Sequence, residues 1–412
     1  AMTEENKNKL RQYKSEVLDY LKVHNNLAFT SDTKRRYEKF PLTDIQNSYV
    51  MGRNRLYELG GICCHGYIEI EVNRLLDPGQ LEVAWNKVIQ KHDMLRAIVS
   101  ASGYQIIQEA VPSVEIIVLD GRDKDISADK EELRTELSTK QYQLGTWPMC
   151  DLALSIEKDK SIIYFSLDML ISDFASMNVM LNDLEKFYEN PHKIIIPTTS
   201  YRDIVLYQEK RKTFNSKSRQ EAEVYWNKKI SMMGDAPNLP VIGMEDNQEV
   251  SFLQKKVFLN DKQWNAFAEL AKSYNITPSV FVMAALAEVI AVWSGDKKFC
   301  INTTLLNRPE VAEDIYKVVG DFTDVNITAI DIEYSETFLE SVKKLQMDLW
   351  SDLEHKDVSG VEIIRRLTKE RKKNVIMPVV FTSTLGVSSK DDTTVKNRIV
   401  YKLSQTPQVY ID

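Results

Sequence analysis

Cysteine pairs and positive charge are both scarce in this chain, and each shortage excludes a class of protein. The four cysteines are Cys63, Cys64, Cys150 and Cys300, and they form no C-x-x-C pair. They therefore indicate neither a zinc site nor a disulfide framework. The net charge of −7 argues against nucleic acid as the main partner.

Long apolar runs are also absent. No run reaches the length that spans a membrane, and no signal peptide opens the sequence. We therefore expect a cytoplasmic protein without membrane contact. With 43% hydrophobic and 27% charged residues, the composition is typical of a soluble globular protein. The length of 412 residues exceeds what one hydrophobic core usually supports, so we expect two lobes.

The most informative stretch runs from residue 161 to residue 188. Its first part, 162–167, is apolar and rich in strand formers, which predicts a buried strand. Its second part, 174–188, has apolar residues at three- and four-residue spacing, which predicts a helix that buries one face. The polar residues between these two parts are Asp168, Asp173 and Ser176, spaced as D-x4-D-x2-S.

Local structure alone could account for these polar residues. Asp173 lies where the helix would begin and Ser176 follows three residues later, which is the pattern of an N-cap. Asp168 ends an apolar run and could be a buried carboxylate held by one arginine. The alternative is a chemical role, because polar groups at the end of a strand often carry function.

The stretch also resembles a known family. Acyltransferases of the chloramphenicol-acetyltransferase type include the condensation domains of nonribosomal peptide synthetases, which carry HHxxxDG at the end of a strand. Heterocyclization domains of the same synthetases carry DxxxxDxxS there. Asp168 matches the first His, Met169 the catalytic His and Asp173 the motif Asp. Since the histidine base is absent, the chain resembles a heterocyclization domain.

Further motifs of that family follow in order along the chain. F-P-L-T-D-I-Q-x-x-Y-x-x-G-R at 40–53 resembles the opening motif, and its Thr43 and Gln46 also predict a capping box. The sequence H-D-M-L-R at 92–96 resembles the second motif. In related condensation domains, the arginine of this motif pairs with the Asp of the central motif. The resemblance therefore implies a buried ion pair between Arg96 and Asp173, which makes Asp173 structural.

A second candidate site lies near the C-terminus. The sequence V-V-F-T-S-T at 379–384 predicts a strand that ends in hydroxyl groups, and 403–412 resembles the closing motif S-Q-T-P-Q-x-x-x-D. The family places the acid of the closing motif and the Thr of the F-T-S motif at the cyclodehydration site. These residues are Asp412 and Thr382 here. Without the resemblance, Thr382 would be an ordinary strand residue and Asp412 a solvated terminus.

Cyclodehydration requires such groups. The side-chain thiol or hydroxyl of the newly joined residue attacks the amide carbonyl, and the resulting hydroxyl leaves as water. A carboxylate can deprotonate the nucleophile or the ring nitrogen and return the proton to the departing hydroxide. The Thr382 hydroxyl can donate a hydrogen bond to the developing oxyanion or steer the carboxylate of Asp412. Gln405, which has both a donor and an acceptor, could position the substrate amide.

The resemblance implies a two-lobed α/β fold of the chloramphenicol-acetyltransferase type. Its sheets should be mixed, and its lobes should meet in a V with a central tunnel at the junction. We assign residues 1–36 to an N-terminal linker helix, 37–195 to the first lobe and 196–412 to the second lobe.

The implied function is condensation of a carrier-bound aminoacyl or peptidyl thioester with carrier-bound Cys, Ser or Thr, followed by cyclodehydration to a thiazoline or oxazoline. Cysteine is the preferred acceptor, because thiols are the better nucleophiles. The substrates would arrive on phosphopantetheine arms of an upstream and a downstream peptidyl carrier domain, next to an adenylation domain. The domain itself would bind no metal, flavin or nucleotide.

Two other functions stay open. One is a condensation-only acyltransferase, which the absence of HHxxxDG disfavours. The other is a non-catalytic platform on which carrier domains dock. Such a platform would not need the polar residues Thr382 and Asp412.

Overall fold

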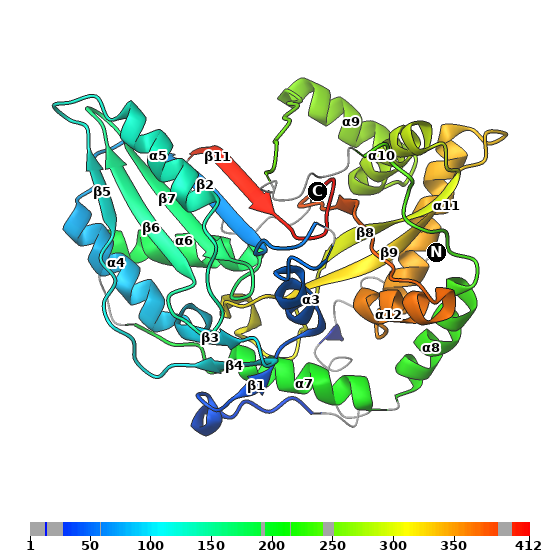
Figure 1. The fold of residues 1–412 in the computed structure, drawn as a ribbon, viewed down its shortest axis with the longest axis horizontal. Helices are drawn as coiled ribbons and strands as arrows, with labels where there is room; N and C mark the ends of the chain where they lie inside the picture. The colour runs from blue at the N-terminus through cyan, green and yellow to red at the C-terminus, as the bar shows by residue number, and fades with distance from the viewer. Residues whose placement is uncertain are drawn as a thin grey trace.

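Two α/β lobes lie side by side in the computed structural model (Figure 1). The structure describes residues 13–14, 28–57, 59–190, 194–214, 216–241, 251–385 and 398–412. The linker helix predicted over 1–36 therefore lies largely outside the described residues. Its described part includes the 3-10 turn η1 (Thr33–Arg35).

The first lobe is built on a five-stranded sheet with the order β11-β2-β7-β6-β5. Neighbouring strands are antiparallel except for β5 and β6, which are parallel. Helices α4 and α6 cover one face of this sheet, and α5 covers the other. A smaller sheet, β1-β4-β3, lies beside it. The elements are β1 (Phe40–Pro41), α3 (Asp44–Gly52), β2 (His65–Val72), α4 (Pro78–Lys91), η2 (Asp93–Arg96), β3 (Ala97–Ser100), β4 (Tyr104–Ile107), β5 (Ile117–Asp120), α5 (Ser127–Ser138), β6 (Cys150–Ile156), β7 (Ser161–Asp168) and α6 (Phe174–Glu189).

The informative stretch folds as predicted. Every residue of β7 is buried, because the strand lies in the middle of the sheet with helices on both faces. Helix α6 begins directly after Asp173, whose side chain caps it. The capping box predicted for Thr43 and Gln46 is also confirmed at the start of α3. That helix lies between the two lobes (Figure 1).

The second lobe has a three-stranded sheet with the order β10-β8-β9. Strand β9 runs antiparallel to β8, and β10 runs parallel to it. Helices α10 and α11 pack on one face and α8 and α12 on the other. The elements from residue 201 onward are α7 (Tyr201–Thr213), α8 (Lys217–Ile230), α9 (Asp261–Ser273), α10 (Pro278–Ser294), β8 (Lys298–Leu306), η3 (Ile315–Lys317), β9 (Thr323–Asp331), α11 (Phe338–Glu354), α12 (Gly360–Arg371), β10 (Val380–Phe381) and β11 (Arg398–Gln405). The predicted two-lobed α/β fold with mixed sheets is therefore confirmed.

Strand β11 crosses between the lobes. It belongs to the chain segment assigned to the second lobe, yet it pairs with β2 in the sheet of the first lobe. Its last residue, Gln405, lies opposite His65, which in turn lies opposite Asp168. The predicted division of the chain at residue 195 did not include the pairing of a strand from the second segment with the sheet of the first lobe. The physical reason is that β2 would otherwise leave its outer backbone groups unpaired at the sheet edge.

The length and apolar composition of the helices show whether any of them could span a membrane. Among the described residues, no single helix is long and apolar enough to cross one. Only α9 and α10 taken together reach the required length and composition, and they are bent by 97° relative to each other.

Candidate functional site

Asp173 ties the two lobes together. Its side chain is fully buried at the start of α6, where Oδ1 accepts a hydrogen bond from the Ser176 backbone nitrogen at 2.6 Å. Nη2 of Arg308 lies 3.0 Å from Oδ1 and 3.3 Å from Oδ2. The backbone nitrogen of Phe322 donates to Oδ2 at 3.2 Å. Arg308 and Phe322 lie on the segment that connects β8 to β9, the strands of the second lobe, and Phe322 packs into the core of the first lobe. This carboxylate is therefore part of the lobe interface.

Ser176 completes the same contact. Its hydroxyl donates to the Gly320 carbonyl at 2.9 Å and accepts from the Gly320 backbone nitrogen at 3.1 Å. The same oxygen accepts from Nη2 of Arg308 at 2.7 Å. We call Asp173, Ser176, Arg308 and Gly320 the interlobe clamp. The D-x2-S part of the central motif thus forms a structural contact.

The predicted pairing of Asp173 with Arg96 is wrong. Arg96 instead contacts Asp93 at 3.1 Å and donates to the carbonyl groups of Ile89 at 2.8 Å and Gln108 at 3.0 Å. It therefore satisfies carbonyl groups near the end of α4, inside the first lobe. The start of α6 faces the second lobe, where Arg308 is the arginine within reach. A buried ion pair does form at Asp173, with a different partner.

Asp168 is a buried carboxylate held by an arginine, which was one of the two interpretations of the sequence. Its side chain is fully buried and pairs with Arg53, the residue that follows α3. Oδ1 also accepts a hydrogen bond from the Leu170 backbone nitrogen at 3.0 Å. Burial raises the pKa of Asp168, and Arg53 offsets part of this shift. These contacts indicate that Asp168 fixes the end of β7 to α3.

The structure brings Thr382 and Asp412 together. Residues 378–380 lie between β8 and the C-terminal segment, where the Val380 backbone nitrogen donates to the Ile411 carbonyl at 2.8 Å. Thr382 follows β10, and its hydroxyl donates to Oδ1 of Asp412 at 3.4 Å, across 30 positions of sequence. Both residues are exposed, so a substrate can reach them. The two groups that cyclodehydration requires are therefore neighbours.

Two further threonines extend this pair. The hydroxyl of Thr304, on β8, lies 2.9 Å from the hydroxyl of Thr382. The hydroxyl of Thr406 donates to Oδ2 of Asp412 at 2.9 Å. Sequence analysis did not single out either residue. The position of Thr406 inside the closing motif was a signal, whereas Thr304 could have been found only from the register between β10 and β8.

Asp412 and the titratable groups near it have raised pKa values. Although Asp412 is exposed as a residue, neighbouring protein atoms partly desolvate its carboxylate and raise its pKa, and hydrogen bonds from Thr406 and Thr382 lower it. The pKa values of the Tyr49 hydroxyl and the Cys64 thiol lie well above their usual ranges, mainly through burial and also through the carboxyl groups of Asp321 and Asp412. Asp321 is itself buried, and its pKa is raised well above the ordinary value for the same reason. Asp412 is thus the most exposed acid of this group.

Gln405 lies in a different environment from that pair. Its side chain is buried, and its amide nitrogen donates to the Ser138 carbonyl of the first lobe at 3.0 Å. Successive residues of an extended chain point to opposite sides, so Thr406 reaches Asp412 while Gln405 points toward the end of α5. The contact with a substrate amide that we expected for Gln405 stays a prediction.

A glycine lets the opening and closing motifs touch. A Cβ atom placed on Gly52 would lie 2.5 Å from Cγ of Pro407, closer than real side chains allow. The next residue, Gln408, donates its backbone nitrogen to the Leu59 carbonyl at 2.9 Å. The segment that carries Asp412 is therefore seated directly on the end of α3.

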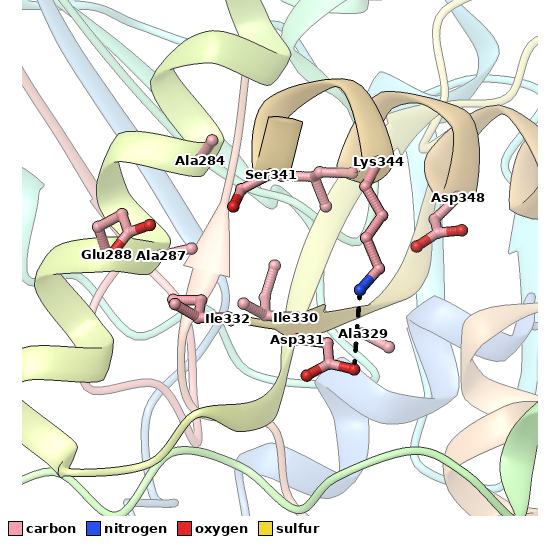
Figure 2. Close-up of a pocket in the computed structure, with 11 residues that line it drawn as sticks. Ala284, Ala287, Glu288, Ala329, Ile330, Asp331, Ile332, Ser341, Lys344 and Asp348 are labelled. Carbon is pink, nitrogen blue, oxygen red and sulfur yellow. Dashed lines mark ion pairs between the residues drawn. The ribbon is translucent and has the colours of Figure 1, made fainter. Parts of the chain in front are cut away.

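Two of the cavities formed by the described residues differ in size and position. The larger, of about 120 Å³, lies where the lobes meet, and Asp44, Lys212, Asn307 and Asp321 are among its lining residues. The smaller, of about 30 Å³, lies between α10, β9 and α11 (Figure 2). There Lys344 reaches toward Asp331, with Nζ 3.9 Å from the carboxylate. The smaller cavity contains no residue of the predicted site.

The residues that the structure describes offer no evident metal site. They include no group of three or more His, Cys, Asp or Glu side chains placed to hold a metal ion.

Comparison with known sequences gives a family and several relatives. The model of the condensation domain family matches residues 37–409. Pyochelin synthetase PchF from Pseudomonas aeruginosa is 30% identical over 411 residues, which are 98% of this chain and 22% of that protein. Phenyloxazoline synthase MbtB from Mycobacterium tuberculosis is 28% identical over 381 residues, which are 91% of this chain and 27% of that protein. The chain thus spans less than a third of the length of these relatives.

The fold of this chain is also similar to the folds of solved synthetase domains. The cyclization-docking bidomain of the synthetase EpoB from Sorangium cellulosum superimposes with a TM-score of 0.84 and 29% identity, over 99% of this chain and 83% of that chain. The first condensation domain of the CDA synthetase matches with a TM-score of 0.68 and 13% identity, over 83% of this chain and 80% of that chain, which supports the fold alone.

Proposed function

Since the chain belongs to the condensation domain family, we propose that it joins two carrier-bound substrates through an amide and then closes that amide to a five-membered ring. The family that the motifs predicted is confirmed, and the likeness to a cyclization domain agrees with the heterocyclization branch. The acceptor would be cysteine, giving a thiazoline, or serine or threonine, giving an oxazoline.

One observation carries this proposal. Thr382 and Asp412, which come from separate segments, meet at 3.4 Å on an exposed surface. At the same time Met169 stands where a condensation domain has its catalytic histidine. A polar pair at this place suits a reaction that must move protons after the amide has formed.

The first step would be attack of the acceptor amine on the donor thioester. The C–N bond forms, the C–S bond breaks, and the donor arm leaves as a thiol. Because a thioester is already activated, holding the two substrates in line can supply much of the rate. We assign no base to this step.

The second step would use the carboxylate of Asp412. It accepts the proton of the attacking thiol or hydroxyl as the new ring bond forms at the amide carbonyl. Once Asp412 holds this proton, the Thr382 hydroxyl turns from Asp412 and donates its hydrogen bond to the oxygen that gains negative charge. Asp412 then returns its proton to that oxygen, which becomes a hydroxyl group. The ring nitrogen gives its own proton to the Asp412 carboxylate, which passes it to the departing hydroxyl as the C–O bond breaks and the C=N bond forms. The products are the ring and one water molecule, so the atoms balance.

The substrates and partners follow from the proposed reaction. The substrates would be thioesters on the phosphopantetheine arms of two partners, an upstream and a downstream carrier domain. An adenylation domain would lie beside them. The cavity at the lobe junction is lined by residues of both lobes, and its lining includes neither Thr382 nor Asp412. We also propose a reducing, cytoplasmic location, because the four cysteines are free and buried.

The test is mass spectrometry of the product formed with both carrier domains loaded. Wild-type protein should give a product one water lighter than the linear amide. Asp412→Ala and Thr382→Ala should accumulate the linear amide, with ring formation slowed by about 10²-fold or more. Thr384→Ala, two residues along the same exposed segment, is the matched control and should behave like wild type.

The two competing functions predict different products. If wild type releases only linear amide, the chain is a condensation-only acyltransferase. If it forms neither product while both carriers bind, it is a docking platform.

A further inference from the structure

Four side chains form one continuous row of hydrogen bonds in the order Thr304, Thr382, Asp412 and Thr406. The successive oxygen–oxygen distances are 2.9 Å, 3.4 Å and 2.9 Å. Thr304 lies on β8, Thr382 follows β10, and Thr406 and Asp412 follow β11. We call this arrangement the threonine row.

The chemistry of the groups gives the row a direction. An ionised carboxylate only accepts hydrogen bonds, so Thr382 donates its single proton to Oδ1 of Asp412. The Thr382 oxygen is then an acceptor for the proton of Thr304. Thr406 donates to Oδ2, the other carboxylate oxygen. The hydroxyl dipoles therefore all point toward Asp412, and such chains strengthen one another.

We propose that Thr304 and Thr406 are positioning residues for ring formation, with Thr304 orienting the Thr382 hydroxyl and Thr406 fixing the carboxylate of Asp412. This inference rests on the proposed function and adds two residues to it. Each acts through a neighbour, since Thr304 contacts Thr382 and Thr406 contacts Asp412.

The two threonines should have separable effects on pH dependence. Thr406 touches the carboxylate directly, and its hydrogen bond lowers the pKa of Asp412. Loss of that donor should raise this pKa, so the acidic limb of the rate profile should move to higher pH. Thr304 does not touch the carboxylate, so its loss should slow the reaction and leave the limb in place.

Other titratable groups near Asp412 do not produce the same signal. Tyr49 and Cys64 have pKa values raised well above their usual ranges, so they stay protonated through neutral pH. Asp321 is the other carboxyl that acts on both of these groups. Its side chain is buried, and its Oδ1 accepts from the Thr323 backbone nitrogen at 3.0 Å. Substitution of Thr406 leaves these contacts unchanged.

The experiment starts from the linear amide loaded on the acceptor carrier, so that only ring closure is measured. Single-turnover rates would be compared from about pH 5 to pH 9 for wild type, Thr406→Val, Thr304→Val and the matching serine variants. We expect Thr406→Val to lower the rate about tenfold at pH 7 and to shift the acidic limb upward by about one pH unit. Thr304→Val should lower the rate about three- to tenfold without a shift, and both serine variants should recover most of the rate.

The outcomes separate the inference from the function on which it rests. If both valine variants close the ring at the wild-type rate with the wild-type pH limb, while Asp412→Ala does not, the inference is wrong and the function stands. If the serine variants are as slow as the valine variants, the hydroxyls are not responsible and the inference is again wrong. If wild type closes no ring, the proposed function fails and the inference fails with it. The midpoint of thermal unfolding identifies any variant that is slow because it is unfolded.

Discussion

Asp173 and Asp412 are both motif aspartates with hydroxyl-bearing neighbours, yet their surroundings are opposite. Asp173 is fully buried, and its two oxygens receive four hydrogen bonds, from two backbone nitrogens and twice from Arg308. A carboxylate has about four acceptor positions, so none is left for a substrate. Asp412 is exposed, and its described partners are two hydroxyl groups.

The difference shows how the same side chain can serve structure or chemistry. A carboxylate whose positions are filled by an arginine and backbone donors joins two parts of the fold. A carboxylate oriented by neutral hydroxyls keeps free acceptor positions and can exchange a proton with a substrate. In this molecule the central motif, through Asp173, connects the two lobes. The closing motif contains Asp412, the acid that we propose for ring formation.

The largest effect on stability should come from breaking the interlobe clamp. Asp173→Ala and Arg308→Ala should each lower the free energy of unfolding by about 3–5 kcal/mol, because either change leaves a buried charge without its partner. Asp412→Ala should change it by less than about 1 kcal/mol, since its partners are neutral and the residue is exposed. Urea unfolding of the three variants measures the contrast.

A double-mutant cycle tests the identity of the partner. Asp173 and Arg308 should show a coupling energy of at least about 1 kcal/mol, because they are in direct contact. Asp173 and Arg96, the pair that the family motif suggested, should show additive effects. Coupling to Arg96 and additivity with Arg308 would contradict the structure.

The local structure around Asp173 could be predicted from the sequence, but its partner could not. The strand and helix around Asp173 were predictable, because apolar spacing and an N-cap are local signals. The structural role of Asp173 was predictable too. Its partner was not, since Arg308 lies 135 positions away and meets Asp173 only after the lobes pack together.

The candidate site was predictable only in part for a similar reason. Motif resemblance identified Thr382 and Asp412, and the structure brings them together. Thr304 reaches the site through the register of β10 with β8, which no local pattern encodes. The crossing of β11 into the first lobe was missed because the choice of a neighbouring strand depends on which sheet edge is open.

The surroundings of Asp324 are intermediate between those of Asp173 and Asp412. It is half-buried, and two neutral groups donate hydrogen bonds to it, the Val325 backbone nitrogen at 2.8 Å and the Asn307 amide at 3.2 Å. Burial is the main reason that its pKa is raised to about 6. The folded protein then binds more protons than the unfolded chain between about pH 4 and pH 6, so the free energy of unfolding falls as pH rises through this window.

Asp324→Asn should remove this contribution. Relative to wild type, the variant should be more stable at pH 7 than at pH 4.5 by on the order of 2 kcal/mol. Urea unfolding at the two pH values gives this difference, and other titrating groups cancel because they occur in both proteins. An equal difference between variant and wild type at both pH values would show that Asp324 does not carry the effect.

The smallest expected effect concerns the packing that holds Asp412 in place. In Gly52→Ala the new methyl group would meet Pro407, which must move to make room. We expect a loss of about 1–2 kcal/mol in the free energy of unfolding and a lower ratio of ring to linear amide, because a small displacement of a catalytic group slows its reaction. Gly79→Ala is the matched control, since its nearest neighbour would lie at an ordinary 3.4 Å. If Gly52→Ala lost stability but kept the wild-type product ratio, the hydroxyls of the threonine row would be sufficient to position Asp412. If the ratio fell while the control kept it, the reactive carboxylate would depend on close packing as strictly as the buried one depends on its arginine.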